Sequence, residues 1–217
     1  MTDVALEVVD DPARVCAERL AAQARAGGSV VLTGGSTARS AYEIAAELEP
    51  DWSRVDVWWG DERCVPPDDE RSNFGMAKEA LLDRLGAAPR SVHRMESVEQ
   101  YTRELDGVGT FDLVLLGLGP DGHIASLFPD FPTLDVVDLD VVGTHAGHEP
   151  FVDRITLTLP RLRNTRELLF LVTGANKADA VARAFTGGPT QEAPGSLVRA
   201  AAGPTQAILD RAAAARL

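Results

Sequence analysis

The feature that most constrains the fold is a set of short apolar runs that polar residues do not interrupt. Strands with one face in solvent alternate apolar and polar residues, whereas strands of a parallel sheet covered on both faces are apolar throughout. Segments with helical character follow most of these runs. This order predicts an α/β protein with a doubly wound, mostly parallel sheet and helices on both faces. The runs are ALEVV, SVVLTGG, RVDVWWG, FDLVLLG, ELLFLVTG and TQAILD.

Helix signals lie between the runs and set the predicted boundaries. Segment 10–28 has Asp before Pro at its start and glycine at its end, the usual punctuation of a helix. A second helix is predicted over 36–49, with Ser36 or Thr37 as its N-cap. With no repeat, low-complexity tract or linker, residues 1–217 are predicted to form a single domain. The other expected segments are helices at 72–86 and 175–188, a short terminal helix at 211–217, and irregular loops around one short strand at 130–152.

The charge balance and the apolar runs exclude several classes of partner. The net charge of −12 and the pI near 4.7 argue against a general nucleic-acid surface, which needs basic residues to neutralise phosphates. No apolar run reaches the ~20 residues of a membrane span. The N-terminal sequence lacks the pattern of a signal peptide. We therefore expect a soluble, cytoplasmic protein with no nucleic-acid or membrane partner.

Cysteines, histidines and surface patterning give three further expectations. Cys16 and Cys64 lie far apart with no CxxC motif, so we interpret them as reduced thiols rather than a disulfide. The histidines at 93, 123, 145 and 148 are scattered and do not predict a metal site. No stretch reads as a large exposed apolar patch, so a monomer is expected.

Polar side chains that can bind a ligand or take part in a reaction follow four of the apolar runs. In open α/β sheets, ligands bind outside the carboxyl ends of the strands. The four segments are 33–37, 60–63, 117–123 and 173–177. We therefore expect them to meet at one edge of the sheet and form a single site.

Two of these segments have features suited to an anion such as phosphate. Gly34 and Gly35 would let backbone N–H groups approach a ligand, and Ser36 and Thr37 open a helix whose dipole favours an anion. The alternative is a tight turn with a hydroxyl cap. Lys177 lies in the first turn of its predicted helix, where its charge opposes the dipole unless an anion is bound. Its alternative is a solvated lysine that points away.

Two arginines extend the list of candidate anion ligands. Arg63 offers a planar, permanently charged fork suited to phosphate or carboxylate oxygens. Its alternative is an ion pair with Asp61 or Glu62. Arg154 precedes an alternating strand, ITLTL, and its pattern alone fits a surface position.

The segment GLGPDGHIASLFP, residues 117–129, matches the G-x-G-x-x-G pattern of a dinucleotide-binding turn. Such a turn needs a helix directly after its glycines, and Pro129 and Pro132 follow too closely for a long helix. Asp121 would also place a carboxylate near the pyrophosphate. We therefore expect no nucleotide cofactor and interpret the glycines as a sharp turn that presents Asp121 and His123 at the sheet edge.

His123 is the candidate acid–base group of this turn. Histidine exchanges a proton near neutral pH, and a neighbouring carboxylate can orient the ring and stabilise its protonated form. We favour this role over a structural histidine because three anion-suited segments are expected beside it. Ser126 lies close in sequence, but no G-x-S-x-G pattern marks it as an activated nucleophile.

Taken together, the motifs TGGST, GDERCVP, SNFGMAKEALL, GLGPDGHIASLFP, RITLTLP and VTGANKA resemble those of the 6-phosphogluconolactonase family. Their order and spacing match over roughly residues 30–180. The resemblance implies a Rossmann-like α/β fold, shared with glucosamine-6-phosphate deaminases and ribose-5-phosphate isomerases. It also implies hydrolysis of a small sugar-phosphate lactone, 6-phospho-D-glucono-1,5-lactone, to 6-phosphogluconate in the oxidative pentose phosphate pathway, without a cofactor.

The resemblance also suggests roles for individual residues. His123 would act as a general base on the water that attacks the lactone carbonyl, and its imidazolium would protonate the leaving ring oxygen. Asp121 would orient or stabilise that imidazolium. Arg63 would belong to the catalytic group and also hold the phosphate, and backbone N–H groups of the glycine turn would stabilise the oxyanion. The implied substrate- and phosphate-binding residues are Gly34, Gly35, Ser36, Thr37, Asp61, Asn73, Arg154 and Lys177.

Two other functions fit parts of the pattern. The deaminase branch has DGHIAFNEP, with a glutamate five positions beyond the histidine, where this chain has Phe128. Ile124 follows the deaminase pattern, but ring opening and isomerisation need the further acid–base group that Phe128 does not supply. A sugar-phosphate-sensing module would need an attached DNA-binding segment, and no helix-turn-helix pattern is found. Hydrolysis is therefore the favoured hypothesis.

Overall fold

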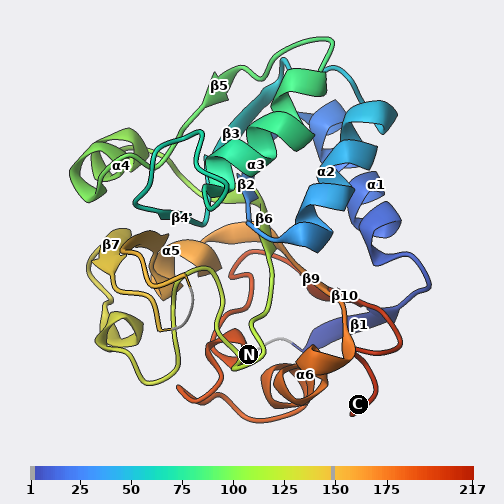
Figure 1. The fold of residues 1–217 in the computed structure, drawn as a ribbon, viewed down its shortest axis with the longest axis vertical. Coiled ribbons are helices and arrows are strands. Elements are labelled where there is room, and N and C mark those ends of the chain that lie inside the picture. Colours follow the sequence, from blue (N-terminus) through green and yellow to red (C-terminus); the bar gives the residue numbers. More distant parts are fainter. Residues whose placement is uncertain (1–2, 148–149) are drawn as a thin grey trace.

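The computed structural model describes residues 3–147 and 150–217, and these residues build a seven-stranded sheet (Figure 1). Every strand pair in this sheet is parallel, which confirms the prediction drawn from the uninterrupted apolar runs. Across the sheet, the strands are β1 (Val4–Val8), β10 (Thr205–Leu209), β9 (Thr165–Val172), β6 (Phe111–Leu116), β2 (Gly28–Leu32), β3 (Val55–Trp59) and β5 (Ser91–Val92).

Helices lie on both faces of this sheet, as predicted. From β1 to β5 the chain moves in one direction across the sheet, and from β5 to β10 it moves back. Because such crossovers are right-handed, the first three helices cover one face and the last three cover the other, as Figure 1 shows. The helices are α1 (Pro12–Ala26), α2 (Ser36–Leu48), α3 (Asn73–Ala80), α4 (Val98–Leu105), α5 (Leu159–Arg163) and α6 (Ala178–Phe185). Short 3-10 turns are η1 (Leu82–Arg84), η2 (Pro132–Asp135), η3 (Ala175–Lys177) and η4 (Pro194–Ser196).

The direction of winding changes between β2 and β6, which are neighbours in the sheet. After β2 the chain turns to one face to form α2, and after β6 it turns to the other face. The loops that follow these two strands therefore separate at the carboxyl edge and leave a crevice between them, which is where open α/β sheets bind ligands.

A second sheet of three antiparallel strands lies beside this edge. Its strands are β4 (Asp61–Arg63), β8 (Arg154–Leu157) and β7 (Val141–Thr144), in the order β4-β8-β7. One residue, Gly60, separates the end of β3 from the start of β4, and Arg63 is opposite Arg154 in the register of β4 and β8. The small sheet therefore adds a wall to the crevice.

Both tyrosines of the chain hold the backbone at the ends of strands near this edge. The Tyr42 hydroxyl donates to the Thr33 carbonyl oxygen at 2.8 Å and accepts from the Thr33 N–H at 2.9 Å. The Tyr101 hydroxyl makes the same pair of bonds with Trp59, at 3.0 and 2.9 Å. Both phenols are fully buried, so each satisfies two backbone groups that the sheet leaves unpaired.

Two predicted details at helix ends are wrong. The N-cap of α2 is Gly35, with φ of 106°, and neither Ser36 nor Thr37 caps the helix with its side chain. A left-handed residue is needed to turn from β2 into α2, and glycine adopts it without steric cost. The terminal segment 211–217 forms turns instead of a helix, because the bond from the Ala214 N–H to the Asp210 carbonyl four residues back is followed by bonds that reach only three residues back, from Ala215 and Leu217.

Three further expectations concern the cysteines, segment 130–152 and membrane-spanning helices. Cys16 is buried and Cys64 is exposed, and neither forms a disulfide, as predicted. Segment 130–152 contains η2 and β7 with loops around them, while residues 148 and 149 lie outside the described part of the chain. Of the helices in residues 3–147 and 150–217, none is both long and apolar enough to cross a bilayer.

Candidate active site

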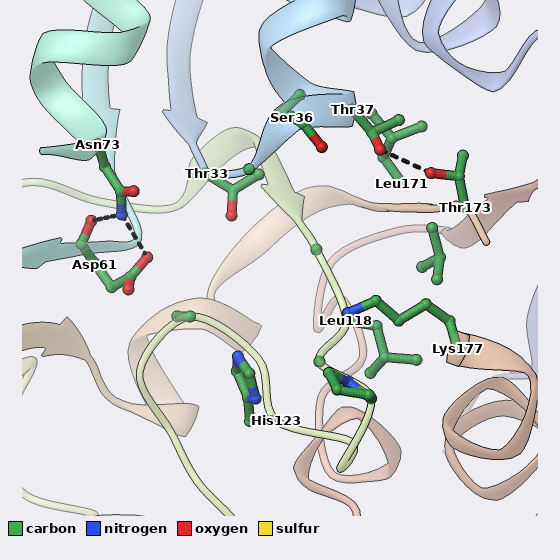
Figure 2. A pocket seen from close by; sticks show the side chains of 18 of the residues that line it. Thr33, Ser36, Thr37, Asp61, Asn73, Leu118, His123, Leu171, Thr173 and Lys177 are labelled. Atoms are coloured by element: carbon green, nitrogen blue, oxygen red, sulfur yellow. Dashed lines mark hydrogen bonds between the residues drawn. The ribbon is translucent and has the colours of Figure 1, made fainter. Parts of the chain in front are cut away.

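The four polar segments expected to meet do so around one pocket at the carboxyl edge of the sheet. The pocket has a volume of about 430 Å³. Figure 2 shows Thr33, Ser36 and Thr37 above it, Asp61 and Asn73 on one side, Lys177 on the other, and His123 pointing into it from below. All the predicted site residues except Asp121 line it directly: Gly34, Gly35, Ser36, Thr37, Asp61, Arg63, Asn73, His123, Arg154 and Lys177.

The loop between β2 and α2 brings backbone close to the pocket. A Cβ atom at Gly34 would lie 2.1 Å from Asn73 Oδ1, so only glycine fits beside this asparagine. Gly35 then starts α2 with a left-handed backbone. The loop thus presents the N-terminus of a 13-residue helix to the pocket, where backbone N–H groups and the helix dipole favour an anion.

The DER segment forms a short strand, β4, and its alternation separates the roles of its side chains. Asp61 and Arg63 are two residues apart and both line the pocket. Glu62 is buried outside the pocket, where its carboxylate accepts from the N–H groups of Asn73 and Phe74 at 2.7 Å each and from the Ser72 hydroxyl at 3.0 Å. Burial raises the pKa of Glu62, and these donors work against that rise. Glu62 therefore anchors the N-terminus of α3.

Asp61 is held from two sides by buried donors. Asn73 Nδ2 donates to Asp61 Oδ1 at 3.2 Å and to the Asp61 carbonyl oxygen at 3.0 Å. The Ser126 hydroxyl donates to Asp61 Oδ2 at 2.6 Å. All three residues are at most 4% exposed. The carboxylate therefore has a fixed orientation in the pocket wall.

The glycine-rich turn after β6 holds a histidine–carboxylate pair. His123 Nδ1 lies 2.6 Å from Asp121 Oδ1, which also accepts from the His123 backbone N–H at 3.1 Å. A Cβ atom at Gly119 would lie 2.0 Å from His123 Nδ1, so this glycine makes room for the ring. Gly122 has φ of 97° and turns the chain toward His123. The interpretation of these glycines as a turn that presents Asp121 and His123 fits this geometry.

Asp121 is ionised over the whole physiological pH range. Partial burial would raise its pKa, but the hydrogen bonds from the His123 ring and backbone and the charge of the ring outweigh burial and lower the pKa to about 2. The carboxylate therefore holds the Nδ1 side of the imidazole and fixes the orientation of the ring.

Phe128 packs against this pair. Its side chain is 1% exposed, and its ring centroid lies 5.1 Å from that of His123. The position five residues beyond the histidine thus contributes an apolar surface beside the imidazole instead of a second acid–base group.

Arg63 and Arg154 face each other across β4 and β8 and place two guanidinium groups in one wall. Arg154 is 3% exposed, so the alternative of a surface position is wrong. Burial lowers the pKa of Arg154, and the neighbouring charge of Arg63 lowers it further. Among the described residues, neither guanidinium lies within 4.0 Å of a carboxylate, so the expected alternative of an ion pair between Arg63 and its acidic neighbours is not found. Arg63 instead donates to the Arg71 carbonyl oxygen.

Lys177 supplies a third cation from the opposite side of the pocket. It lies at the end of η3, directly before α6, and its side chain extends into the pocket (Figure 2). Burial lowers the pKa of Lys177, and the nearby Asp121 carboxylate opposes this shift. Two like-charged arginines and a half-buried lysine around one cavity are unfavourable unless an anion joins them.

Sequence reasoning gave no role to two residues at this site, although Thr173 opens the expected segment 173–177. Thr173 Oγ1 and Thr37 Oγ1 lie 2.7 Å apart and join the β2–α2 loop to the segment that carries Lys177. Thr173 directly follows an apolar run, so the rule that located the other segments contains the signal that marks it. Ser126 contacts Asp61 across 65 positions of sequence, and no local pattern signals such a contact.

Comparisons with known proteins place the chain among relatives of similar length. A family model described as glucosamine-6-phosphate isomerases/6-phosphogluconolactonase matches residues 2–207. A 6-phosphogluconolactonase of Streptomyces coelicolor is 38% identical, over 94% of this chain and 88% of its own. The crystal structure of 6-phosphogluconolactonase from Thermotoga maritima is 31% identical with a TM-score of 0.84, and covers 97% of this chain and 100% of that one.

The fold alone does not separate the two activities of this family description. A monomeric glucosamine-6-phosphate deaminase has a TM-score of 0.85 over 100% of both chains, at only 17% identity. That similarity shows a shared fold and nothing about the reaction. The distinction has to come from the residues of the site.

Proposed function

Because this chain belongs to the glucosamine-6-phosphate isomerase/6-phosphogluconolactonase family, we propose that it is an enzyme that hydrolyses 6-phospho-D-glucono-1,5-lactone to 6-phosphogluconate. This reaction would place it in the oxidative pentose phosphate pathway. The observation that carries the proposal is the His123–Asp121 pair beside a pocket whose three cations have no carboxylate partner among the described residues. A substrate with a phosphate and an ester carbonyl matches both features.

The phosphate is proposed to bind at the N-terminus of α2. The backbone N–H groups of Gly35, Ser36 and Thr37 would donate to the phosphate there, and the hydroxyls of Ser36 and Thr37 would add two further donors. Lys177 approaches from the other side of the pocket, and the Thr37–Thr173 hydrogen bond connects the two segments. Arg63 and Arg154 add positive charge that draws the dianion into an otherwise acidic protein.

The hydrolysis is proposed to begin with proton transfer to His123. Asp121 holds Nδ1, so Nε2 accepts a proton from a water molecule as the water oxygen attacks the C1 carbonyl. The oxyanion that forms is stabilised by Arg63 and by backbone N–H groups of the glycine turn. When the C1–O5 bond breaks, the imidazolium returns the proton to O5, which becomes a hydroxyl. C1 is left as a carboxylic acid, which releases its proton to solvent and becomes a carboxylate.

Phe128 supports hydrolysis over the deaminase reaction. Ring opening and isomerisation need a further acid–base group near the imidazole, and an apolar ring packs there instead. Lactone hydrolysis needs one base, because the same histidine can accept and return the proton.

The proposal is tested by initial rates of lactone hydrolysis above the spontaneous rate. The substrates are freshly generated 6-phosphogluconolactone and unphosphorylated glucono-1,5-lactone, with ammonia release from glucosamine 6-phosphate measured in parallel. We expect rapid hydrolysis of the phosphorylated lactone, much slower hydrolysis of the other, and no ammonia. Equal rates for the two lactones would contradict the phosphate site, and ammonia release would contradict the reaction.

A further inference from the structure

We propose that Ser126 is a positioning residue that holds Asp61 as an acceptor for ring hydroxyls, so that the site selects polyhydroxylated lactones. The inference rests on the proposed function and adds the basis of its substrate selectivity. Its starting point is a contact between two buried residues that lie 65 positions apart, Ser126 on the turn after His123 and Asp61 on β4.

The Ser126 hydroxyl is buried and contacts the Asp61 carboxylate. The residue is fully buried, and its Oγ donates to Asp61 Oδ2 at 2.6 Å, a short bond of the kind that a hydroxyl makes to a carboxylate. Its backbone N–H is held separately by Thr156 Oγ1 at 3.3 Å. The preceding residue, Ala125, has φ of 47°, a conformation that costs energy for a residue with a Cβ atom. The turn therefore keeps a strained backbone at the point that directs Ser126 toward Asp61.

Asp61 has acceptor capacity left over after this contact. An ionised carboxylate accepts about four hydrogen bonds, and the side chains of Ser126 and Asn73 supply one to each oxygen. Asp61 lines the pocket, so the remaining lone pairs are available to a bound molecule. Only a donor can use them, and a sugar lactone carries its donors as ring hydroxyls.

The charges around the pocket separate the two ends of such a substrate. A phosphate is drawn to Lys177 and the N-terminus of α2 and is repelled by Asp61, whereas a developing oxyanion is drawn to Arg63 and Arg154, which lie on the Asp61 side of the pocket. Figure 2 shows Asp61 and Lys177 on opposite sides of the pocket. Hydroxyl groups would therefore lie at the Asp61 side when the phosphate lies near Lys177, and the fixed orientation of the carboxylate decides how well they bind.

Ser126→Ala tests this role with substrates that differ by one hydroxyl. Initial rates are measured on 6-phosphogluconolactone and on its 2-deoxy and 3-deoxy analogues, which keep the same phosphate and ester. We expect wild type to prefer the parent lactone in kcat/KM over at least one deoxy analogue by about tenfold or more, as for a hydrogen bond to a charged group. Ser126→Ala should lower kcat/KM for the parent and leave that deoxy analogue nearly unchanged.

The matched control is Ser29→Ala. Ser29 also donates its hydroxyl to an aspartate, Asp112 Oδ2 at 3.1 Å, but at the amino end of β2 and away from the pocket. This variant should keep the wild-type preference between the lactones. A loss of preference in both variants would show a general effect of destabilisation and would overturn the proposal.

A double-mutant cycle with Asp61→Asn separates positioning from a structural role. If Ser126 acts through Asp61, Asp61→Asn should lose the preference by itself, and Ser126→Ala should add no further change in that background. Equal losses on all lactones, or the same effect of Ser126→Ala in both backgrounds, would contradict the inference. Should Ser126→Ala fail to fold, Asp61→Asn alone must still lose the preference. If wild type hydrolyses none of the lactones, the proposed function fails instead.

Discussion

Two histidines of this protein each contact a carboxylate through Nδ1, but their rings face different surroundings. His123 Nδ1 lies 2.6 Å from Asp121, and His93 Nδ1 lies 2.7 Å from Glu104. Their side chains are similarly buried, at 17% and 23% exposed. His123 points into the pocket, whereas the His93 ring stacks on Trp58 with centroids 3.6 Å apart.

Both ring nitrogens of His93 lie within hydrogen-bond distance of other side chains of the protein. Its Nε2 lies 2.8 Å from Ser91 Oγ, and this serine donates to Asp56 at 2.6 Å. The residues join β5, the edge strand of the sheet, to α4. The contrast teaches that a histidine–carboxylate pair is a candidate catalyst only where its ring faces a cavity that can hold a substrate. His93 has the pair, but its ring stacks on Trp58 and its second nitrogen contacts Ser91.

The largest loss of activity is expected when the space that Gly119 leaves for the His123 ring is removed. In Gly119→Ala, the new Cβ would lie 2.0 Å from His123 Nδ1 and 2.6 Å from Asp121 Oδ1, so the pair must move. We expect kcat to fall by about 10²- to 10⁴-fold, the range that acid–base catalysis supplies. The measurement is steady-state hydrolysis of 6-phosphogluconolactone. Gly117→Ala is the control, since its Cβ meets no atom within 4 Å, and an equal loss there would contradict the steric argument.

Lys177→Met tests whether the cavity beside His123 is an anion site. The variant keeps the length of the side chain and removes its charge, so KM should rise by about 10- to 100-fold with a smaller change in kcat. Because burial lowers the pKa of Lys177, the KM of wild type should also rise on the alkaline side at a lower pH than for an exposed lysine. The control is Lys78→Met, which removes the chain's other lysine, on the surface beside Asp83. A matching rise in KM for Lys78→Met would contradict the phosphate site.

Asp121→Asn tests the contribution of the carboxylate that contacts the His123 ring. We expect kcat to fall by about tenfold, the loss of one hydrogen bond to a charged group, while KM changes little. The folded pKa of about 2 lies below the ordinary value, so the stability that the carboxylate contributes is present above that ordinary value. It is lost as pH falls toward 2. Unfolding titrations should therefore show wild type and variant converging in stability between about pH 5 and pH 2, and a constant difference would contradict the assignment.

His93→Gln gives the smallest expected effect on activity. Loss of the stack on Trp58 and of the bonds to Ser91 and Glu104 should lower the free energy of unfolding by roughly 1–2 kcal/mol. Denaturant unfolding measures this change. The kcat and KM for the lactone should stay within about twofold of wild type, and a large loss would show that the second pair also serves the reaction.

The sequence predicted the main sheet well because its strands carry their signal locally. Uninterrupted apolar runs identify strands that are covered on both faces, and the polar residues after them mark the functional edge. Helix α4 was missed although its signal is present: Ser97 caps it by accepting from the Gln100 N–H at 3.1 Å, in a Ser-x-x-Gln pattern.

Other features depend on contacts between distant segments and had no local signal. β4 consists of Asp61, Glu62 and Arg63, which resemble a polar loop, and it is a strand only because it pairs with β8. The same pairing buries Arg154, whose alternating neighbourhood suggested the surface. The bond from Ser126 to Asp61 likewise requires the turn after β6 to return to β4.

Whether His123 is the base of a lactone hydrolase is tested by comparing the His123→Ala and His93→Gln variants. Initial hydrolysis of 6-phosphogluconolactone is followed above the spontaneous rate for wild type and both variants at one pH. We expect a wild-type rate for His93→Gln and a loss of about 10²- to 10⁴-fold in kcat for His123→Ala. Near-normal turnover by a folded His123→Ala protein would show that His123 is not the base.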